Sequence, residues 1–191
     1  MCPSLAPAVF APCSFVCDCK QEYRSACLGE PFYKHLDGKW YCVLHYPRAD
    51  KIPVFQKAFQ RKLAKGGYLD FQGVWFPTDV NFTRFAFVES DFTGATFNGN
   101  AKFFHATFAK GAYFSGAIFK GEANFGAARF EKGVNFGSTT FKRAIDFTYA
   151  SFWREVDFTG ARFDRAVIFR DAHFGDYARF ARGVHPVFGS D

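Results

Sequence analysis

Phenylalanine recurs at every fifth or sixth position through the second half of the chain. The recurring positions are Phe82, Phe87, Phe92, Phe97, Phe103, Phe108, Phe114, Phe119, Phe125, Phe130, Phe136, Phe141, Phe147, Phe152, Phe158, Phe163, Phe169, Phe174 and Phe180. Two positions before nearly every one stands a small or β-branched residue, such as Ala95, Ala117 or Val156. From Phe92 onward steps of five and six residues alternate, so the full period is eleven.

This spacing excludes the two commonest patterns of secondary structure. An amphipathic helix needs apolar residues about 3.6 positions apart, and an amphipathic strand needs strict alternation. A short extended segment followed by a corner fits better, because the outer two residues of Ala-x-Phe then share one face. Turn-forming or charged residues follow each phenylalanine, as in Thr93-Gly94, Ser115-Gly116 and Thr159-Gly160.

Self-similarity of this kind predicts a solenoid, in which each unit buries its apolar face against its neighbours. Four sides per coil give a coil of 22 residues, with small and large inward residues complementing each other in each layer. Weaker repeats at Leu69-Asp70-Phe71 and Val74-Trp75-Phe76 extend the pattern backward, so 21 sides, or about five coils, are expected.

The repeats Ala95-Thr96-Phe97, Ala117-Ile118-Phe119, Ala123-Asn124-Phe125, Val156-Asp157-Phe158 and Ala161-Arg162-Phe163 resemble the pentapeptide-repeat family in its phenylalanine-centred variant. The resemblance implies an all-β solenoid, a right-handed quadrilateral β-helix, over more than half of the chain. It also implies a binding or structural role, and dimerisation through the C-terminal coils.

Composition and charge narrow the function. The chain has 191 residues, 29 of them phenylalanine, and a net charge of +6. Several members of the family mimic DNA and bind type II topoisomerases, which requires a strongly negative surface. Here residues 71–180 hold thirteen basic and eleven acidic side chains, so DNA mimicry is disfavoured.

The 22-residue coil predicts which outward side chains stack. The four columns are Thr96, Ile118, Thr140 and Arg162; Lys102, Asn124, Asp146 and Ile168; Thr107, Arg129, Ser151 and His173; and Asp91, Tyr113, Asn135, Asp157 and Arg179. None is acidic or basic throughout, so these columns are interpreted as ordinary solvated faces that do not bind nucleic acid.

The region before the repeats has a different character. Residues 1–16 are proline-rich and almost uncharged, which indicates an extended arm. Residues 17–49 concentrate soft metal ligands, and four of them fit a tetrahedral, structural zinc site. The preferred ligands are Cys19, Cys27, Cys42 and His45, with Cys17 as an alternative to Cys19. The segment Gly38-Lys39-Trp40-Tyr41-Cys42-Val43-Leu44-His45 also resembles a Cys/His element that precedes the repeats in some family members.

Other roles for these cysteines remain open at this point. Disulfides require an oxidising compartment, for which the N-terminus offers no secretion signal. Buried free thiols are a further alternative. Cys42 and His45 could act as nucleophile and base, but no third orienting group is evident.

Residues 50–67 predict an amphipathic helix with Asp50 as N-cap and Gly66 at its end. Ile52, Phe55, Phe59 and Leu63 share one face, which could cover the N-terminal mouth of the β-helix at residues 68–180. Phe85 replaces a small residue in an early coil, so irregular packing is expected beneath this cap. The tail, 181–191, is too short for a comparable cap, which leaves the C-terminal end to the tail, a second protomer or a partner protein.

The functional hypothesis is a non-enzymatic, cytoplasmic interaction scaffold that binds a protein partner or itself and has no membrane-spanning segment. The outward aromatic residues Phe104, Tyr113, Tyr149, Trp153 and Tyr177 are candidate contacts. The alternative hypothesis is a regulator associated with a topoisomerase or with nucleic acid, acting through the basic residues of the cap.

Overall fold

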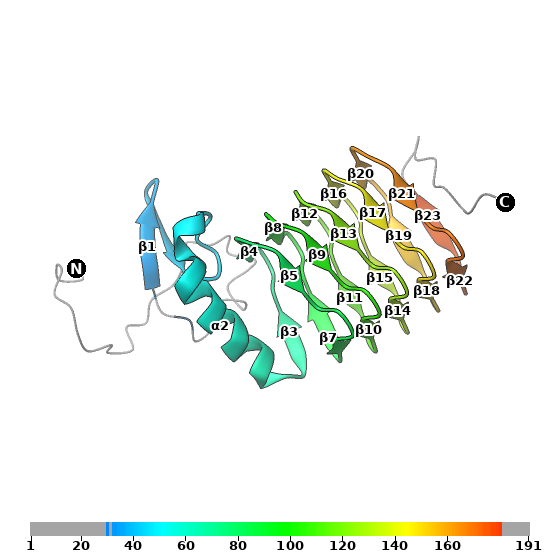
Figure 1. Ribbon diagram of the computed structural model, residues 1–191, viewed down its shortest axis with the longest axis horizontal. Coiled ribbons are helices and arrows are strands. Elements are labelled where there is room, and N and C mark those ends of the chain that lie inside the picture. Colours follow the sequence, from blue (N-terminus) through cyan, green and yellow to red (C-terminus); the bar gives the residue numbers. More distant parts are fainter. Residues whose placement is uncertain (1–29, 31, 181–191) are drawn as a thin grey trace.

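The computed structural model describes residue 30 and residues 32–180, which form an N-terminal cap and a β-helix (Figure 1). The cap contains the hairpin β1 (Phe32–Leu36) and β2 (Lys39–Cys42), the short 3-10 helix η2 (Ala49–Lys51) and the helix α2 (Ile52–Lys65). The predicted arm at 1–16 and tail at 181–191 lie outside the described residues.

The β-helix has four faces, and each face is a sheet of parallel strands. This confirms the quadrilateral solenoid. Face 1 consists of β3 (Tyr68–Asp70), β7 (Glu89–Asp91), β11 (Ala112–Tyr113), β15 (Val134–Asn135), β19 (Val156–Phe158) and β23 (Ala178–Phe180). Face 2 consists of β4 (Trp75–Phe76), β8 (Thr96–Phe97), β12 (Ile118–Phe119), β16 (Thr140–Phe141) and β20 (Arg162–Phe163). Face 3 consists of β5 (Val80–Asn81), β9 (Ala101–Lys102), β13 (Ala123–Asn124), β17 (Ile145–Asp146) and β21 (Val167–Ile168). Face 4 consists of β6 (Ala86–Phe87), β10 (Thr107–Phe108), β14 (Arg129–Phe130), β18 (Ser151–Phe152) and β22 (His173–Phe174).

Strand pairing confirms the predicted register. Ile118 pairs with Thr96 in the coil before it and with Thr140 in the coil after it, 22 residues away in each direction. The first coil is one residue shorter, since Phe76 pairs with Phe97. The missing residue belongs to the corner between Phe87 and Phe92, where the step is five residues instead of six.

The inward phenylalanines form the core as stacks of nearly parallel rings. Phe97 and Phe119 have ring centroids 4.4 Å apart and planes 6° from parallel, and Phe103 and Phe125 are 4.6 Å apart at 2°. Neighbouring stacks meet edge to face, as Phe103 and Phe114 do at 88°. The quadrupole of the aromatic ring favours both arrangements, so the rings that fill the axis make specific contacts with one another.

The alternation of five- and six-residue steps corresponds to two kinds of corner. After faces 1 and 3 the chain makes a tight turn with one residue at positive φ, such as Gly94 (65°) or Ala127 (53°). Asp and Asn on these faces accept the backbone N–H two residues later, as Asn124 does from Gly126 at 2.8 Å. These two columns therefore stabilise turns, a role that the interpretation as plain solvated faces missed.

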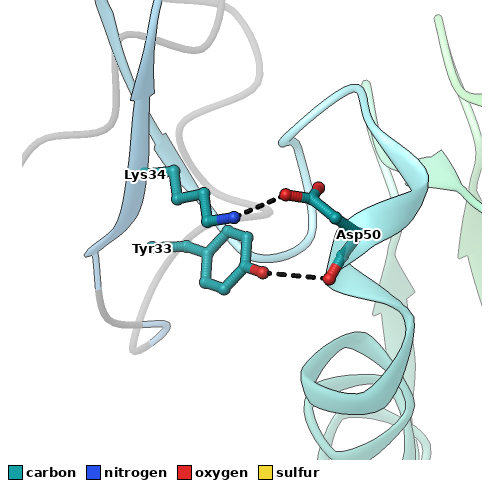
Figure 2. A network of polar contacts seen from close by, with 3 residues as sticks. All are labelled: Tyr33, Lys34 and Asp50. Carbon is teal, nitrogen blue, oxygen red and sulfur yellow. Dashed lines mark hydrogen bonds and ion pairs between the residues drawn. The ribbon is translucent and has the colours of Figure 1, made fainter.

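The cap hairpin turns at Asp37 and Gly38, which both have positive φ (50° and 78°) as a two-residue turn requires. It is joined to η2 through Asp50, whose carboxylate pairs with Lys34 and whose carbonyl oxygen accepts from the Tyr33 hydroxyl (Figure 2). The prediction of Asp50 as the helix N-cap is wrong, since Lys51 occupies that position without a side-chain bond. The Asp50 carboxylate is engaged by the hairpin instead.

Helix α2 covers the N-terminal end of the β-helix, as its apolar face predicted (Figure 1). Phe59 lies 5.7 Å from Phe71 and 5.8 Å from both Phe76 and Phe82, between ring centroids. Phe85 is half-buried and lies 4.6 Å from Phe87. The expected irregularity beneath the cap is therefore a large ring at a position that alanine holds in later coils.

Candidate functional site

The predicted ligand pair Cys42 and His45 comes together at the end of β2. The backbone N–H groups of His45 and Tyr46 both donate to the Cys42 carbonyl oxygen, at 3.2 Å and 3.1 Å, which closes a single turn. This turn brings Cys42 Sγ within 3.0 Å of His45 Nδ1. Cys42 is 0% and His45 5% exposed, so the pair lies in the interior between the hairpin and the first coil.

The other ring nitrogen of His45, Nε2, contacts a backbone carbonyl group. His45 Nε2 lies 2.8 Å from the carbonyl oxygen of Gln72, and a carbonyl can only accept. Nε2 therefore donates its proton to this carbonyl oxygen, and a ring with a single proton then presents the Nδ1 lone pair to Cys42. A metal-binding histidine commonly has this arrangement, with its other N–H donated to a backbone carbonyl.

Lys51 is a buried lysine that sequence reasoning missed. Its Nζ donates to the Leu44 carbonyl oxygen at 2.7 Å and lies over the rings of Phe55 (4.6 Å) and Trp75 (5.4 Å). Burial lowers the pKa of Lys51 from 10.5 to about 6, and negative charge on the nearby Cys42 would act in the opposite direction. A lysine at the start of an amphipathic helix resembles any solvated lysine in sequence, so no signal marked it.

The turn of residues 42–46 also joins the cap to the first coil. The Leu44 carbonyl oxygen accepts from the backbone N–H of Trp75 in β4 at 3.1 Å, in addition to Lys51. The His45 ring reaches Gln72, just before β4, in the same region. The edge of face 2 is thus partly paired by the segment that carries the candidate ligands.

The other candidate ligands come earlier in the chain than the residues that the structure describes. Cys19 and Cys27, and the alternative Cys17, lie outside the described residues. Within residue 30 and residues 32–180, no three side chains of His, Cys, Asp or Glu gather as a metal site would require. The described part of the chain therefore contributes two of the four predicted ligands, already adjacent.

The buried position of Cys42 and His45 bears on the catalytic alternative. A nucleophile and its base must reach a substrate, and both side chains are enclosed by β2, η2 and the first coil. This burial suits a structural metal site or a buried thiol better than an active site.

The basic residues of the helix are partly engaged within the cap. Arg61 forms an ion pair with Glu30 at 2.9 Å, and the Lys62 ammonium lies 5.8 Å from the centre of the Phe71 ring. Both side chains contact other residues of the protein. Fewer of the helix's positive charges are therefore available to a polyanion than the sequence suggested.

The outward aromatic residues are exposed as predicted. Phe104, Tyr113, Tyr149, Trp153 and Tyr177 are 41%, 41%, 62%, 51% and 56% exposed. Corner residues stack with the same 22-residue repeat, so Lys110, Lys132 and Arg154 follow one another between faces 4 and 1. Applying the repeat to the corners as well as to the strands would have found this column.

Comparison with known proteins identifies the repeats alone. A family model described as pentapeptide repeats (9 copies) matches residues 82–129 and 125–173. No curated protein and no solved structure matches the chain. Of the described helices, none has the length and apolar character needed to cross a membrane.

Proposed function

This chain belongs to the pentapeptide-repeat family, and from that premise we propose that it is a non-enzymatic interaction scaffold. It is a rigid β-helical rod that binds a protein partner, or a second copy of itself, through its outer surface. Its N-terminal cap is stabilised by zinc held by Cys19, Cys27, Cys42 and His45. The pentapeptide-repeat solenoid is generally a non-catalytic scaffold.

The observation that carries this proposal is the filled axis of the β-helix. Inward phenylalanines from Phe71 to Phe158, with the exception of the half-buried Phe85, are no more than 1% exposed, and their rings stack from coil to coil. A close-packed interior leaves no space for a substrate, so recognition falls to the outer faces and corners. Exposed aromatic residues on that surface are the residue types that dominate protein interfaces.

The scaffold role is tested by quantitative pull-down from cells that express the full chain, followed by mass spectrometry, with light scattering on the purified protein. A stoichiometric protein complex or a defined oligomer is expected. A monomer that enriches no protein above an unrelated solenoid control would refute the scaffold.

The zinc proposal rests on the geometry of His45. Its Nδ1 faces Cys42 while Nε2–H is held by Gln72, which is the configuration that a zinc-binding imidazole needs. Zinc would cross-link the segment of residues 17–29 to the end of β2 and would stabilise a small element with little core of its own.

Elemental analysis of protein purified without added metal tests the site. About one zinc per chain is expected, falling to background in a Cys42→Ser/His45→Ala variant, whereas His35→Ala serves as a control outside the set. The alternative is a buried thiol. It would be identified if the full-length protein contains no zinc and Cys42 reacts with a thiol reagent only after denaturation.

A further inference from the structure

The corner between faces 4 and 1 gathers cations and aromatic rings on successive coils. The backbone N–H of Glu131 donates to the Phe108 carbonyl oxygen, and that of Trp153 donates to Phe130, both at 3.0 Å. These bonds hold the corners in register, one above another. We call Lys110, Arg129, Glu131, Lys132, Trp153 and Arg154 the basic corner.

Part of the basic corner is hollowed. An open depression of about 500 Å³ is lined by Arg129, Glu131, Lys132, Trp153 and Arg154. All five residues are exposed, and the Trp153 ring leans toward His173 with centroids 6.0 Å apart. The depression thus has one large apolar wall and a cationic rim.

The charges of this region are unequally paired. Arg154 lies 3.6 Å from Asp176, and Arg179 lies 3.3 Å from Glu155, which also accepts from the Tyr177 hydroxyl at 3.1 Å. Lys110, Arg129 and Lys132 form no ion pair with any other residue of the described chain. Positive charge is therefore in excess toward the coils of β10 and β14.

We propose that the basic corner is the surface through which this scaffold binds its protein partner, and that the partner presents an extended acidic segment with an apolar side chain for Trp153. The inference rests on the proposed scaffold function and specifies its binding site. Carboxylates of the segment pair with Arg129, Lys132 and Lys110, and its apolar side chain covers the Trp153 ring. Tryptophan and arginine are the residues most often found at the energetic centres of protein interfaces.

The mixed charge favours an acidic protein over nucleic acid. Glu131 lies inside the depression, and Glu155 and Asp176 lie beside it, so a continuous phosphate backbone would meet three carboxylates along the same corner. A peptide can instead donate hydrogen bonds from its backbone N–H groups to a carboxylate such as that of Glu131. Alternating carboxylates and amide donors match this corner better than a uniform polyanion does.

The opposite corner, between faces 2 and 3, provides a matched comparison. It also carries cations, among them Lys142, Arg143 and Arg165, and Lys142 pairs with Asp164 at 2.8 Å. It has no aromatic residue, since its corner positions are held by Asn, Gly, Lys, Arg, Asp, Glu, Ala, Pro and Thr. Charge alone would make the two corners equivalent, whereas the proposal requires the corner that has Trp153.

The experiment uses the full chain, labelled with nitrogen-15, and an octapeptide of alternating glutamate and leucine as the probe. We expect the indole N–H of Trp153 and the amides of residues 129–132 to shift, with a dissociation constant below about 1 mM. Arg129→Ala/Lys132→Ala and Trp153→Ala should each weaken binding by about fivefold or more, while Arg143→Ala/Arg165→Ala should change it less than about twofold. Circular dichroism checks that each variant retains the fold.

Three results of the binding experiments would overturn the inference. They are no shift at several millimolar peptide, equal binding of an octapeptide of alternating lysine and leucine, or tighter binding of a single-stranded oligothymidine at the same residues. The pull-down separates the two proposals. If it recovers the same partner with wild type and with an Arg129→Ala/Lys132→Ala/Trp153→Ala variant, the basic corner is refuted and the scaffold stands.

Discussion

The hydroxyl of Thr139 donates a hydrogen bond to the carbonyl oxygen of Phe114, 2.7 Å away, inside the β-helix. Thr139 holds a position that alanine holds in the neighbouring coils, at Ala117 and Ala161, and it is completely buried. A polar side chain is tolerated there because it finds an acceptor on the coil before it. Ser90 holds a comparable inward position, but its buried Oγ has no partner among the described residues.

This contrast predicts opposite effects for two conservative substitutions. Ser90→Ala removes a buried hydroxyl without a hydrogen bond and should raise the free energy of unfolding by about 1 kcal/mol. Thr139→Val keeps the shape but loses the bond to Phe114, and should lower it by about 1 kcal/mol. Urea unfolding followed by circular dichroism measures both. Equal effects of the same sign would contradict the assignment of the two hydroxyls.

Close approach of successive coils predicts that two corner glycines differ in tolerance. A Cβ added to Gly121 would lie 2.5 Å from the backbone carbonyl group of Gly99, whereas at Gly133 the nearest atom is 3.5 Å away. Neither residue has positive φ. Gly121→Ala should therefore cost about 1–3 kcal/mol through overpacking.

Gly133→Ala is the control for this experiment. It fits without displacement and should be neutral or slightly stabilising, because alanine restricts the unfolded chain. The two melting temperatures compared under one set of conditions decide the point. A Gly121→Ala protein as stable as Gly133→Ala would show that the coils can separate at this corner.

The sequence predicted the β-helix almost completely, because a solenoid repeats one local rule. The inward phenylalanines, the 22-residue register and the covering helix all follow from residue spacing. What spacing could not supply is the role of the outward residues. All three of Asn124, Asp146 and Thr140 are outward residues, but only Asn124 and Asp146 accept a backbone N–H two residues later, at the start of a tight turn. That difference depends on which corner follows, and the repeat pattern does not show it.

The candidate site was predictable only in part, for a different reason. Cys42-x-x-His45 has the spacing of a one-turn chelate, and the structure brings the two side chains together. The Asp37-Gly38 hairpin turn is a signal that the sequence carried and that the metal-centred interpretation overlooked. Lys51 is buried by contacts with Leu44, Phe55 and Trp75, which come from three separate segments. No local pattern encodes such a position.

If zinc holds the cap, removing one ligand should loosen the cap and spare the coils. Cys42→Ser should make residues 17–65 sensitive to protease, with cleavage sites read by mass spectrometry, while the β-sheet circular dichroism of residues 68–180 is retained. The coils keep their own stacked core, so their order does not depend on the metal. Treatment of the wild type with a chelator should give the same cleavage pattern, reversed by added zinc.

Two outcomes would count against this prediction. Unchanged protease sensitivity would show that Cys42 contributes nothing beyond packing. Loss of the β-sheet signal together with the cap would show that the coils require the cap to fold. Lys39→Ala, an exposed change in β2 of the same hairpin, controls for non-specific effects of substitution.

The first coil also predicts a loss of stability at high pH through Tyr68. Burial, followed by the charges of Asp70 and Asp91, raises the pKa of the Tyr68 hydroxyl to about 12, and this hydroxyl lies 3.4 Å from Asp91 Oδ2. The folded protein keeps the phenolic proton between pH 10 and 12, while the unfolded chain releases it near 10. The contribution of Tyr68 to the free energy of unfolding is therefore fully present below pH 10 and falls as the pH rises toward 12. Because Tyr68 is 52% exposed, water screens the effect, and the loss should stay below about 1 kcal/mol.

Comparison with Tyr68→Phe isolates this effect from the other tyrosines. The difference in unfolding free energy between wild type and Tyr68→Phe should be constant from pH 7 to 9 and should shift against the wild type from pH 10 to 11.5. Asp91→Asn removes one of the charges and should lower the pKa of Tyr68. This pKa is measured by titrating the absorbance at 295 nm of Asp91→Asn and subtracting that of Asp91→Asn/Tyr68→Phe. A difference between wild type and Tyr68→Phe that does not change with pH would mean that the phenol titrates alike in the folded and unfolded chain.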